Sequence, residues 1–360
     1  MPDPDTNQLK SALREIDDPN TGAPLGDAVH AVALSGRNAA VEIRLGYPAA
    51  GWRDELEKLV RRRLEAFDEI DSVTVDLSHR IVEHAVQGGL KPLEGVRNII
   101  AVASGKGGVG KSTVAANLAL ALAAEGARAG VLDADIYGPS QPRMLGLKGS
   151  PQTTPDKRIV PFETHGIQAM SIGALVEIDQ AMIWRGPMAS QALNQMLNET
   201  RWNDLDYLVI DLPPGTGDIQ LTLAQRIPVS GSIVVTTPQE VALDDVRRAV
   251  AMFRKVKVPV LGVVENMSTH VCSNCGHEEA IFGAGGGERI AAETGLALLG
   301  RLPLEPALGR STDAGTPIVA AEPDSPSALR LREVARRVAG RLAREAVNTE
   351  IRMPKIRITE

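Results

Sequence analysis

A glycine-rich stretch with two lysines, residues 105–113, carries side chains suited to chemistry on a phosphate group. It reads Gly-Lys-Gly-Gly-Val-Gly-Lys-Ser-Thr and matches a phosphate-binding loop. In such a loop, backbone N–H groups and the N-terminus of the following helix face one anion. We expect Lys111 to contact the β- and γ-phosphates of a nucleotide and Ser112 to offer its hydroxyl to Mg²⁺. The predicted nucleotide-binding residues of the loop are Gly105, Lys106, Gly107, Gly108, Val109, Gly110, Lys111, Ser112 and Thr113.

The second lysine of the loop, Lys106, is not needed to hold phosphate within one chain. A phosphate-binding loop requires only the later lysine, here Lys111. An extra cation this early indicates a deviant loop, in which Lys106 reaches the nucleotide of a partner subunit. We therefore count both lysines among the expected catalytic residues.

Carboxylates follow two apolar runs further along the chain. Asp133 and Asp135 end the run Val-Leu-Asp-Ala-Asp, and a spacing of two puts both side chains on one side of a strand end. We expect Asp133 to support Mg²⁺, and Asp135 to orient or deprotonate the attacking water. Asp211 ends the run Tyr-Leu-Val-Ile-Asp and is the expected Walker-B ligand of Mg²⁺. The Pro/Gly loop after it is expected to change shape with the γ-phosphate.

Cys272 and Cys275 are the only two cysteines of the chain. In a reducing compartment, this spacing predicts a metal or redox site more than a structural disulfide. A [4Fe-4S] cluster needs four thiolates, which two chains related by a twofold axis would supply. A zinc site with His270 and His277 stays open, although its spacing is compressed, and so does a redox or unliganded pair. Taken singly, both histidines are expected at the surface.

The elements that position these residues alternate between apolar strands and helices. Near-continuous apolar strands belong to parallel sheets covered on both faces, so we predict an α/β, doubly wound, mostly parallel sheet. The loop lies between such a strand and an Ala/Leu-rich helix over residues 112–125. Ligands of such sheets bind at the carboxyl ends of the strands, where the motifs fall. The strand candidates are residues 98–103, 129–132, 207–210, 232–236, 260–264 and 298–302.

A stretch mixing glycine and proline, near residues 84–97, marks a linker after a smaller upstream region. That region reads as a small α+β domain, close to the lower size limit for an independent core. Its expected elements are helices over 8–16 and 52–67, a hairpin of 28–34 and 39–45, and a strand over 72–77. The arginines of a C-terminal helix, residues 327–346, are expected to form a solvated face. The expected division is an accessory domain (1–85), a linker (86–97), a P-loop domain (98–346) and a tail without clear structure (347–360).

Composition narrows the class of protein. The 360 residues are 43% hydrophobic but contain no apolar run of about 18 residues, which argues against a membrane-spanning chain. The N-terminus lacks the pattern of a secretory signal, so a cytoplasmic location is expected. A formal charge of −6 and an aromatic content of 3% disfavour nucleic acid as a partner.

The motifs together resemble those of the Mrp/ApbC group of iron-sulfur cluster carrier ATPases, relatives of MinD and ParA. The resemblance is carried by Lys-Gly-Gly-Val-Gly-Lys-Ser-Thr, Asp-Ala-Asp-Ile-Tyr-Gly-Pro-Ser, Ile-Asp-Leu-Pro-Pro-Gly-Thr-Gly-Asp, Glu-Asn-Met-Ser and Cys-Ser-Asn-Cys-Gly-His. It covers about residues 98–345 and extends weakly to 8–85. Two departures are Ser273, where the family commonly has proline, and the lack of a cysteine in the upstream domain.

The resemblance implies a homodimer that sandwiches ATP and hydrolyses it weakly, with Lys106 acting across the interface. It also implies that Asn266 and the Pro303 segment flank adenine, and that Cys272 and Cys275 of two chains share a [4Fe-4S] cluster. The expected partners are apo iron-sulfur proteins and scaffold proteins. The alternative is a MinD/ParA-like positioning switch with a structural zinc site, but we find no basic or amphipathic surface for a membrane or DNA partner.

Overall fold

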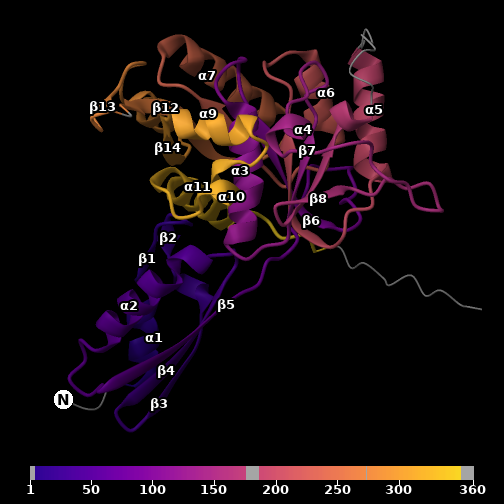
Figure 1. Cartoon of the computed structure of the whole chain (residues 1–360). Helices are drawn as coiled ribbons and strands as arrows, with labels where there is room; N and C mark the ends of the chain where they lie inside the picture. The colour runs from indigo at the N-terminus through magenta and orange to yellow at the C-terminus, as the bar shows by residue number, and fades with distance from the viewer. Residues whose placement is uncertain (1–4, 176–185, 273, 350–360) are drawn as a thin grey trace, which may run out of the picture.

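The computed structural model describes residues 5–175, 186–272 and 274–349 (Figure 1). A large sheet with helices on both faces forms the main body, and a smaller α+β unit extends from it at the N-terminus. Ser273 and residues 350–360 of the expected tail lie outside the described residues. In the part of the chain that the structure describes, no helix is long and apolar enough to cross a membrane.

The strands of the main body form one mixed, mostly parallel sheet. Their order is β13-β12-β11-β6-β10-β7-β9-β8, with β14 paired to β12. Neighbours run parallel except β13 beside β12 and β8 beside β9. The predicted fold class is confirmed. The strands are β6 (Val96–Ala103), β7 (Ala129–Asp133), β8 (Phe162–Thr164), β9 (Ile167–Ser171), β10 (Leu205–Asp211), β11 (Gly231–Thr236), β12 (Val260–Val271), β13 (Glu278–Glu279) and β14 (Leu298–Leu304).

Helices cover both faces of this sheet, as its apolar strands require. Alternate residues of β6 point to opposite faces: Ile100 and Val102 pack in a core with α3 and α11, whereas Ile99 and Ala101 pack with α5 and α6. The helix α3 is apolar on all sides because it lies between the sheet and α11. The helices are α3 (Lys111–Ala124), α4 (Gln141–Met144), α5 (Gly186–Glu199), α6 (Asp218–Arg226), α7 (Glu240–Lys255), α8 (Gly286–Thr294), α9 (Pro306–Asp313), α10 (Ile318–Ala321) and α11 (Pro326–Leu342), with the 3-10 turn η3 (Ile172–Ala174).

The N-terminal unit is the expected small α+β domain. Its strands β3 and β4 form an antiparallel hairpin, β5 runs parallel to β4, and α1 and α2 pack on the sheet. Asp5 caps α1, since its carboxylate accepts a hydrogen bond from the N–H of Gln8 at 2.8 Å. The elements are α1 (Thr6–Arg14), β1 (Asp17–Asp18), β2 (Ala23–Pro24), η1 (Gly26–Ala28), β3 (Val29–Ser35), β4 (Asn38–Leu45), η2 (Ala50–Trp52), α2 (Arg53–Leu64) and β5 (Ser72–His79).

A buried carboxylate joins this small domain to the main body, and the two share one continuous apolar core. Glu125, at the end of α3, accepts hydrogen bonds from the N–H of Gly51 at 2.7 Å and from Arg332 and Arg336 at 2.8 and 2.9 Å. The expectation of a solvated arginine face on the C-terminal helix is therefore wrong for Arg332 and Arg336. They point inward because a buried carboxylate needs a charge partner.

The segment between the two parts is packed against the main body. Gln87 is buried, and its side chain hydrogen-bonds backbone groups of residues 224–229. His84 forms an antiparallel bridge with Val347, so the chain is paired at a position where we expected no clear structure. The predicted division at residues 85 and 97 stays a prediction.

The sequence did not predict β8, β9 or β13, and it ended β12 at residue 264 instead of Val271. These segments are short or polar, so they lack the long apolar run that marks a strand in the sequence; β8 pairs with its neighbour β9, β13 with the end of β12, and only β9 also pairs with a more distant strand, β7. Two of them bear on the site: β9 ends at Ser171, and β13 pairs with the strand that leads to the cysteines.

Candidate functional site

The phosphate-binding loop connects β6 to the first turn of α3 at the carboxyl edge of the sheet. Gly108 and Gly110 have φ angles of 81° and 79°, in the left-handed region that favours glycine. A Cβ on Gly110 would lie 2.2 Å from Nδ2 of Asn266, and one on Gly105 would lie 2.2 Å from Cβ of Asp245. The loop borders a cavity of about 280 Å³, hereafter the phosphate cavity. Its lining comprises Ser104, residues 106–113, Asp135, Gly138, Ser140, Met144 and Pro214.

The ammonium group of Lys111 lies among the predicted carboxylates. Its Nζ forms an ion pair with Asp211, lies 3.9 Å from a carboxylate oxygen of Asp135 and 3.3 Å from Oγ of Ser112. Lys111 and Asp211 are both buried, so each charge depends on the other for neutralisation. The structure thus brings together Lys111, Ser112, Asp135 and Asp211, while their catalytic and metal-binding roles stay predictions.

Gln141 belongs to this cluster, although sequence reasoning missed it. Its Nε2 donates to the carboxylate of Asp211 at 3.0 Å and to the backbone oxygen of Ser112 at 3.0 Å. Gln141 follows directly after the Asp-Ala-Asp-Ile-Tyr-Gly-Pro-Ser run, so its position beside a motif was the available signal. It links the strand β10 to the start of α3.

Asp133 lies deeper than its neighbour Asp135. Its carboxylate accepts hydrogen bonds from the backbone N–H groups of Asp135, Ser140 and Gln141 and from the hydroxyl of Ser171. Burial, followed by the nearby negative charge of Asp211, raises the pKa of Asp133 to about 7. In this structure its oxygens hold the loop 134–141 in place, whereas the prediction has them support Mg²⁺.

Asp135 lines the phosphate cavity and is the more accessible of the two. Burial is the main cause that raises the pKa of Asp135, and the charge of Lys111 opposes it. Its oxygens also accept backbone hydrogen bonds from Gly138 and Tyr137. A carboxylate at this edge of the cavity is placed to face a water molecule beside a bound phosphate.

The residues around the phosphate cavity fit a hydrated Mg²⁺ ion. In the described part of the chain, Oγ of Ser140 and Oε1 of Gln141 are buried without a hydrogen-bond partner. Ser140 lines the phosphate cavity, and Gln141 adjoins Asp211. Magnesium prefers oxygen ligands and keeps several waters, which can hydrogen-bond such oxygens. Ser112 and Asp211 would hold the ion, with these two oxygens facing its waters.

Lys106 does not join the Lys111 cluster. It is half-buried on the rim of the phosphate cavity, and its Nζ lies 3.5 Å from Oε1 of Gln239, just before α7. Two apolar side chains are exposed next to these positions in the sequence. Tyr137, which precedes Gly138, is 57% exposed, and Val241, two residues after Gln239, is 70% exposed.

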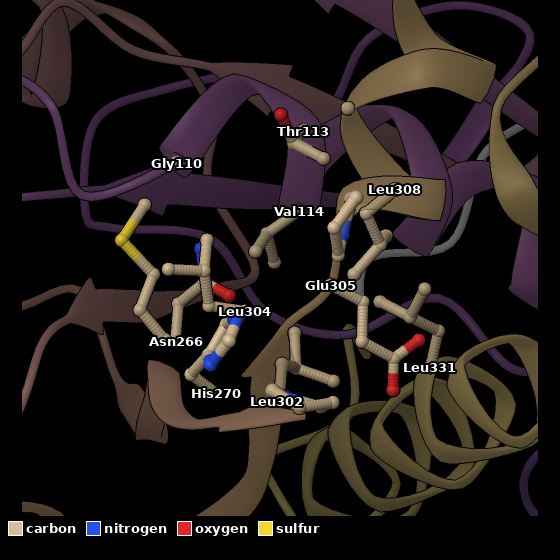
Figure 2. Close-up of a pocket in the computed structure, with 14 residues that line it drawn as sticks. Gly110, Thr113, Val114, Asn266, His270, Leu302, Leu304, Glu305, Leu308 and Leu331 are labelled. Carbon is tan, nitrogen blue, oxygen red and sulfur yellow. The ribbon is translucent and has the colours of Figure 1, made fainter. Parts of the chain in front are cut away.

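A second cavity, of about 450 Å³, adjoins the loop at Gly110 (Figure 2). Both residues predicted to flank adenine, Asn266 and Pro303, line it. We call it the apolar cavity. Asn266 forms its edge nearest the loop and donates from Nδ2 to the backbone oxygen of Val109 at 2.9 Å. Gly110 and Thr113 line both cavities, so one ligand can extend from one into the other. The remaining lining is Val114, Met267, His270, Leu302, Pro303, Leu304, Glu305, Pro306, Leu308, Gly309 and Leu331.

The two cysteines lie at the tip of the β12–β13 hairpin. Cys272 is half-buried and Cys275 is exposed. Hydrogen bonds from the backbone N–H groups of Asn274 and Cys275, and from the thiol of Cys275, lower the pKa of Cys272. The turn closes by a bond from Gly276 N–H to the oxygen of Cys272 at 2.9 Å, with Gly276 at φ 72°. A turn that directs N–H groups at a thiolate stabilises the form that binds metal.

The histidines near the cysteines do not complete a metal site with them. Among the residues that the structure describes, no three His, Cys, Asp or Glu side chains gather as metal ligands. His277 is exposed, as expected. His270 is only partly exposed and lines the apolar cavity (Figure 2). Its side chain turns there because β12 continues beyond its predicted end and carries the residue along the cavity wall.

Comparison with known proteins connects both parts of the chain to iron-sulfur biology. Residues 95–339 match the family described as NUBPL iron-transfer P-loop NTPase, and residues 6–77 match the iron-sulfur cluster assembly protein family. The iron-sulfur cluster carrier protein of Escherichia coli K12 is 52% identical over 316 residues, covering 88% of this chain and 86% of the relative. The iron-sulfur cluster transfer protein NUBPL of Mus musculus is 48% identical over 254 residues, covering 70% and 80%.

Solved structures agree with this fold. A nucleotide-binding protein of Archaeoglobus fulgidus in complex with ADP is 37% identical, with a TM-score of 0.57, and covers 66% of this chain and 92% of its own. The cell division ATPase MinD of Pyrococcus furiosus shares the fold at 21% identity, with a TM-score of 0.52 and coverage of 67% and 98%.

Proposed function

The chain belongs to the Mrp/ApbC/NUBPL family of iron-sulfur cluster carrier proteins, MinD/ParA-like P-loop NTPases, and on this premise we propose that it works as a homodimeric ATPase. The dimer holds one [4Fe-4S] cluster between its two copies. It receives the cluster from scaffold proteins and transfers it to apo-proteins. The observation that carries this proposal is the exposed turn with Cys272 and Cys275.

Two cysteines per chain decide how many chains hold a cluster. A cubane bound only by thiolates needs four, and this chain supplies two. A twofold interface through the hairpin tip would place each turn opposite its symmetry mate. Exposure of the tip supports this arrangement, because the turn is accessible to a second copy and to an acceptor protein. Accessible ligation also suits a cargo that must be released.

The single-chain zinc site is the weaker alternative. It needs His270 and His277 as third and fourth ligands, but among the described residues no such group of ligands gathers, and His270 lines the apolar cavity. A positioning switch of the MinD type would not need the cysteine pair. The geometry of the hairpin therefore favours the cluster over zinc.

Hydrolysis of ATP is assigned to the phosphate cavity. The loop amides hold the phosphates, and Lys111 moves from its ion pair with Asp211 toward the β- and γ-phosphates. Asp135 orients the attacking water, and Pro214, in the loop after Asp211, lines the same cavity. When bound, Mg²⁺ neutralises the phosphate charge that develops in the reaction. Adenine occupies the apolar cavity between Asn266 and Pro303.

The second copy completes the site. Lys106 lies on the rim of the phosphate cavity, away from the Lys111 cluster, which suits a lysine that acts on the nucleotide of the other subunit. A role in hydrolysis predicts that Asp135→Ala binds ATP but retains it unhydrolysed in a radiolabelled turnover assay.

The deciding experiment is anaerobic reconstitution with iron and sulfide. The wild-type dimer should bind about four irons, the content of one shared cubane, and show thiolate-to-iron charge-transfer absorption. Cys272→Ser and Cys275→Ser should each lose the cluster while still binding ATP, because the two sites are separate. The matched control, His277→Ala, alters the same turn without removing a thiolate and should keep the cluster. One zinc per chain that depends on His270 or His277 would refute the proposal.

Transfer provides the functional test. Cluster-loaded wild type should activate an apo-protein that requires a [4Fe-4S] cluster. Equal activation by a double Cys272→Ser/Cys275→Ser variant taken through the same reconstitution would exclude the carrier role.

A further inference from the structure

One strand, β12, runs from the phosphate-binding loop past the apolar cavity to the cysteine turn. Asn266 contacts the loop through Val109, His270 lines the cavity, and Cys272 follows the last residue of the strand. Figure 2 shows His270 among the residues that line this cavity. The nucleotide region and the cysteines are therefore parts of one continuous element.

His270 is also the point where the cysteine hairpin begins. Its backbone pairs with Glu279, and the next residue, Val271, pairs with Glu278. Cys272 donates from its N–H to the oxygen of His277 at 2.9 Å, which closes the tip. A shift of the backbone at His270 is thus passed directly to the turn that holds both thiols.

The strand is irregular just before His270. Between Asn266 and His270, β12 advances four residues while β14 advances only two, from Leu302 to Leu304. Met267, inside this bulge, has a φ of 54°, which a residue with a side chain rarely adopts. Bulges re-aim side chains and recur next to functional sites. Here the bulge accompanies a histidine turned into a cavity whose walls are otherwise mostly aliphatic.

We propose that His270 contacts the base of the bound nucleotide and thereby sets the position of the Cys272–Cys275 turn. This inference rests on the nucleotide site proposed above and names its regulatory link. A flat imidazole on an apolar wall suits the face or edge of a purine. A ligand can shift the turn only if it binds one position of the turn more tightly than another. Contact between the base and His270 provides such a difference, because His270 moves with the turn.

The link is specific to the base. His270 lines the apolar cavity but not the phosphate cavity, so phosphate groups held in the phosphate cavity have no direct contact with it. ATP should therefore alter the cysteine turn, whereas inorganic tripolyphosphate, which has no base, should not. This difference separates the base route from any route through the phosphate-binding loop.

The experiment measures the alkylation rate of the cysteines in the full-length, cluster-free, reduced protein. Competition with a fluorescent ATP analogue first determines the concentrations of ATP and tripolyphosphate that saturate the site, and these concentrations are then used. In wild type, ATP should change the rate about fivefold or more, the lower end of usual couplings, and tripolyphosphate should leave it nearly unchanged. In His270→Ala, ATP should act like tripolyphosphate. The control His277→Ala, an exposed imidazole in the same hairpin, should keep the ATP effect.

Two results would overturn the inference: an equal change with tripolyphosphate in wild type, which needs no substitution, or an undiminished ATP effect in His270→Ala. Either can occur while ATP binds and the cluster forms, so the proposed function would survive. Conversely, a base-dependent change in a protein that never holds a cluster would support the link and remove the carrier role.

Discussion

Replacing Glu125 by glutamine tests how the small domain is held on the nucleotide-binding body. The carboxylate is fully buried and contacts Gly51 of the small domain and the guanidinium groups of Arg332 and Arg336. Glutamine keeps the size of the side chain but removes its charge, so two cations remain without a partner. Breaking a buried ion pair costs about 3–5 kcal/mol. Because the arginines keep 18% and 14% exposure, we expect the lower end, about 3 kcal/mol.

The assay is urea denaturation followed by far-UV circular dichroism, with Glu333→Gln as the matched control. Glu333 pairs with Arg337 on the same C-terminal helix, but both side chains are partly exposed, at 44% and 30%. Removing such a pair should cost about 0.5 kcal/mol or less. If Glu125→Gln is no more destabilising than Glu333→Gln, the network does not hold the domains together and the reasoning is wrong.

Three further predictions concern the phosphate cavity. Lys111→Ala should abolish hydrolysis and weaken ATP binding about ten- to hundredfold, the value of a charged hydrogen bond, in a titration with a fluorescent ATP analogue; unchanged turnover would contradict the assignment. Lys106→Ala should lose hydrolysis as a homodimer but matter only across the interface: when paired with a Lys111→Ala subunit, it should be as active as wild type paired with that subunit, because its intact loop receives Lys106 from the Lys111→Ala copy, and lower activity would count against the cross-interface role. The pKa of Asp133 is about 7 in the folded protein, above its ordinary value of 3.8. Between these two pH values the folded protein binds a proton that the unfolded chain has already released. Its contribution to stability is complete below about pH 4 and is lost as the pH rises through about 7. Asp133→Asn should therefore reduce the fall in unfolding free energy between pH 5 and pH 8 in urea titrations, and an unchanged fall would exclude the raised pKa.

Local patterns predicted the parts of the site that depend on neighbouring residues. The glycine-rich pattern of residues 105–113 predicted a phosphate-binding loop, and in the structure Gly108 and Gly110 adopt left-handed conformations that favour glycine. Asp211 was placed by the apolar strand that it ends, since the ends of parallel strands meet at one edge of the sheet. The chance of error was low because each pattern spans only a few residues and fixes its own geometry.

Contacts between distant segments could not be predicted in this way. Gln141 meets Asp211 across 70 positions, and Arg332 meets Glu125 across 207. The single sequence shows arginines on a helix but not which carboxylate that helix covers, so a solvated face was the natural expectation. Burial of Glu125 reversed it, because an interior carboxylate is stable only with cations beside it.

The sequence by itself determined the phosphate-binding loop, the doubly wound sheet and a cysteine pair too small to hold a cubane alone. These follow from residue type and spacing, which control backbone conformation and ligand number. Only the tertiary structure decided that Asp133 is enclosed by donors, that His270 faces the apolar cavity instead of the cysteines, and that Glu125 ties the two domains together. Each of these depends on which surfaces the packed core brings into contact, and the direction of a side chain at such a contact is set by its new neighbours and not by those along the chain.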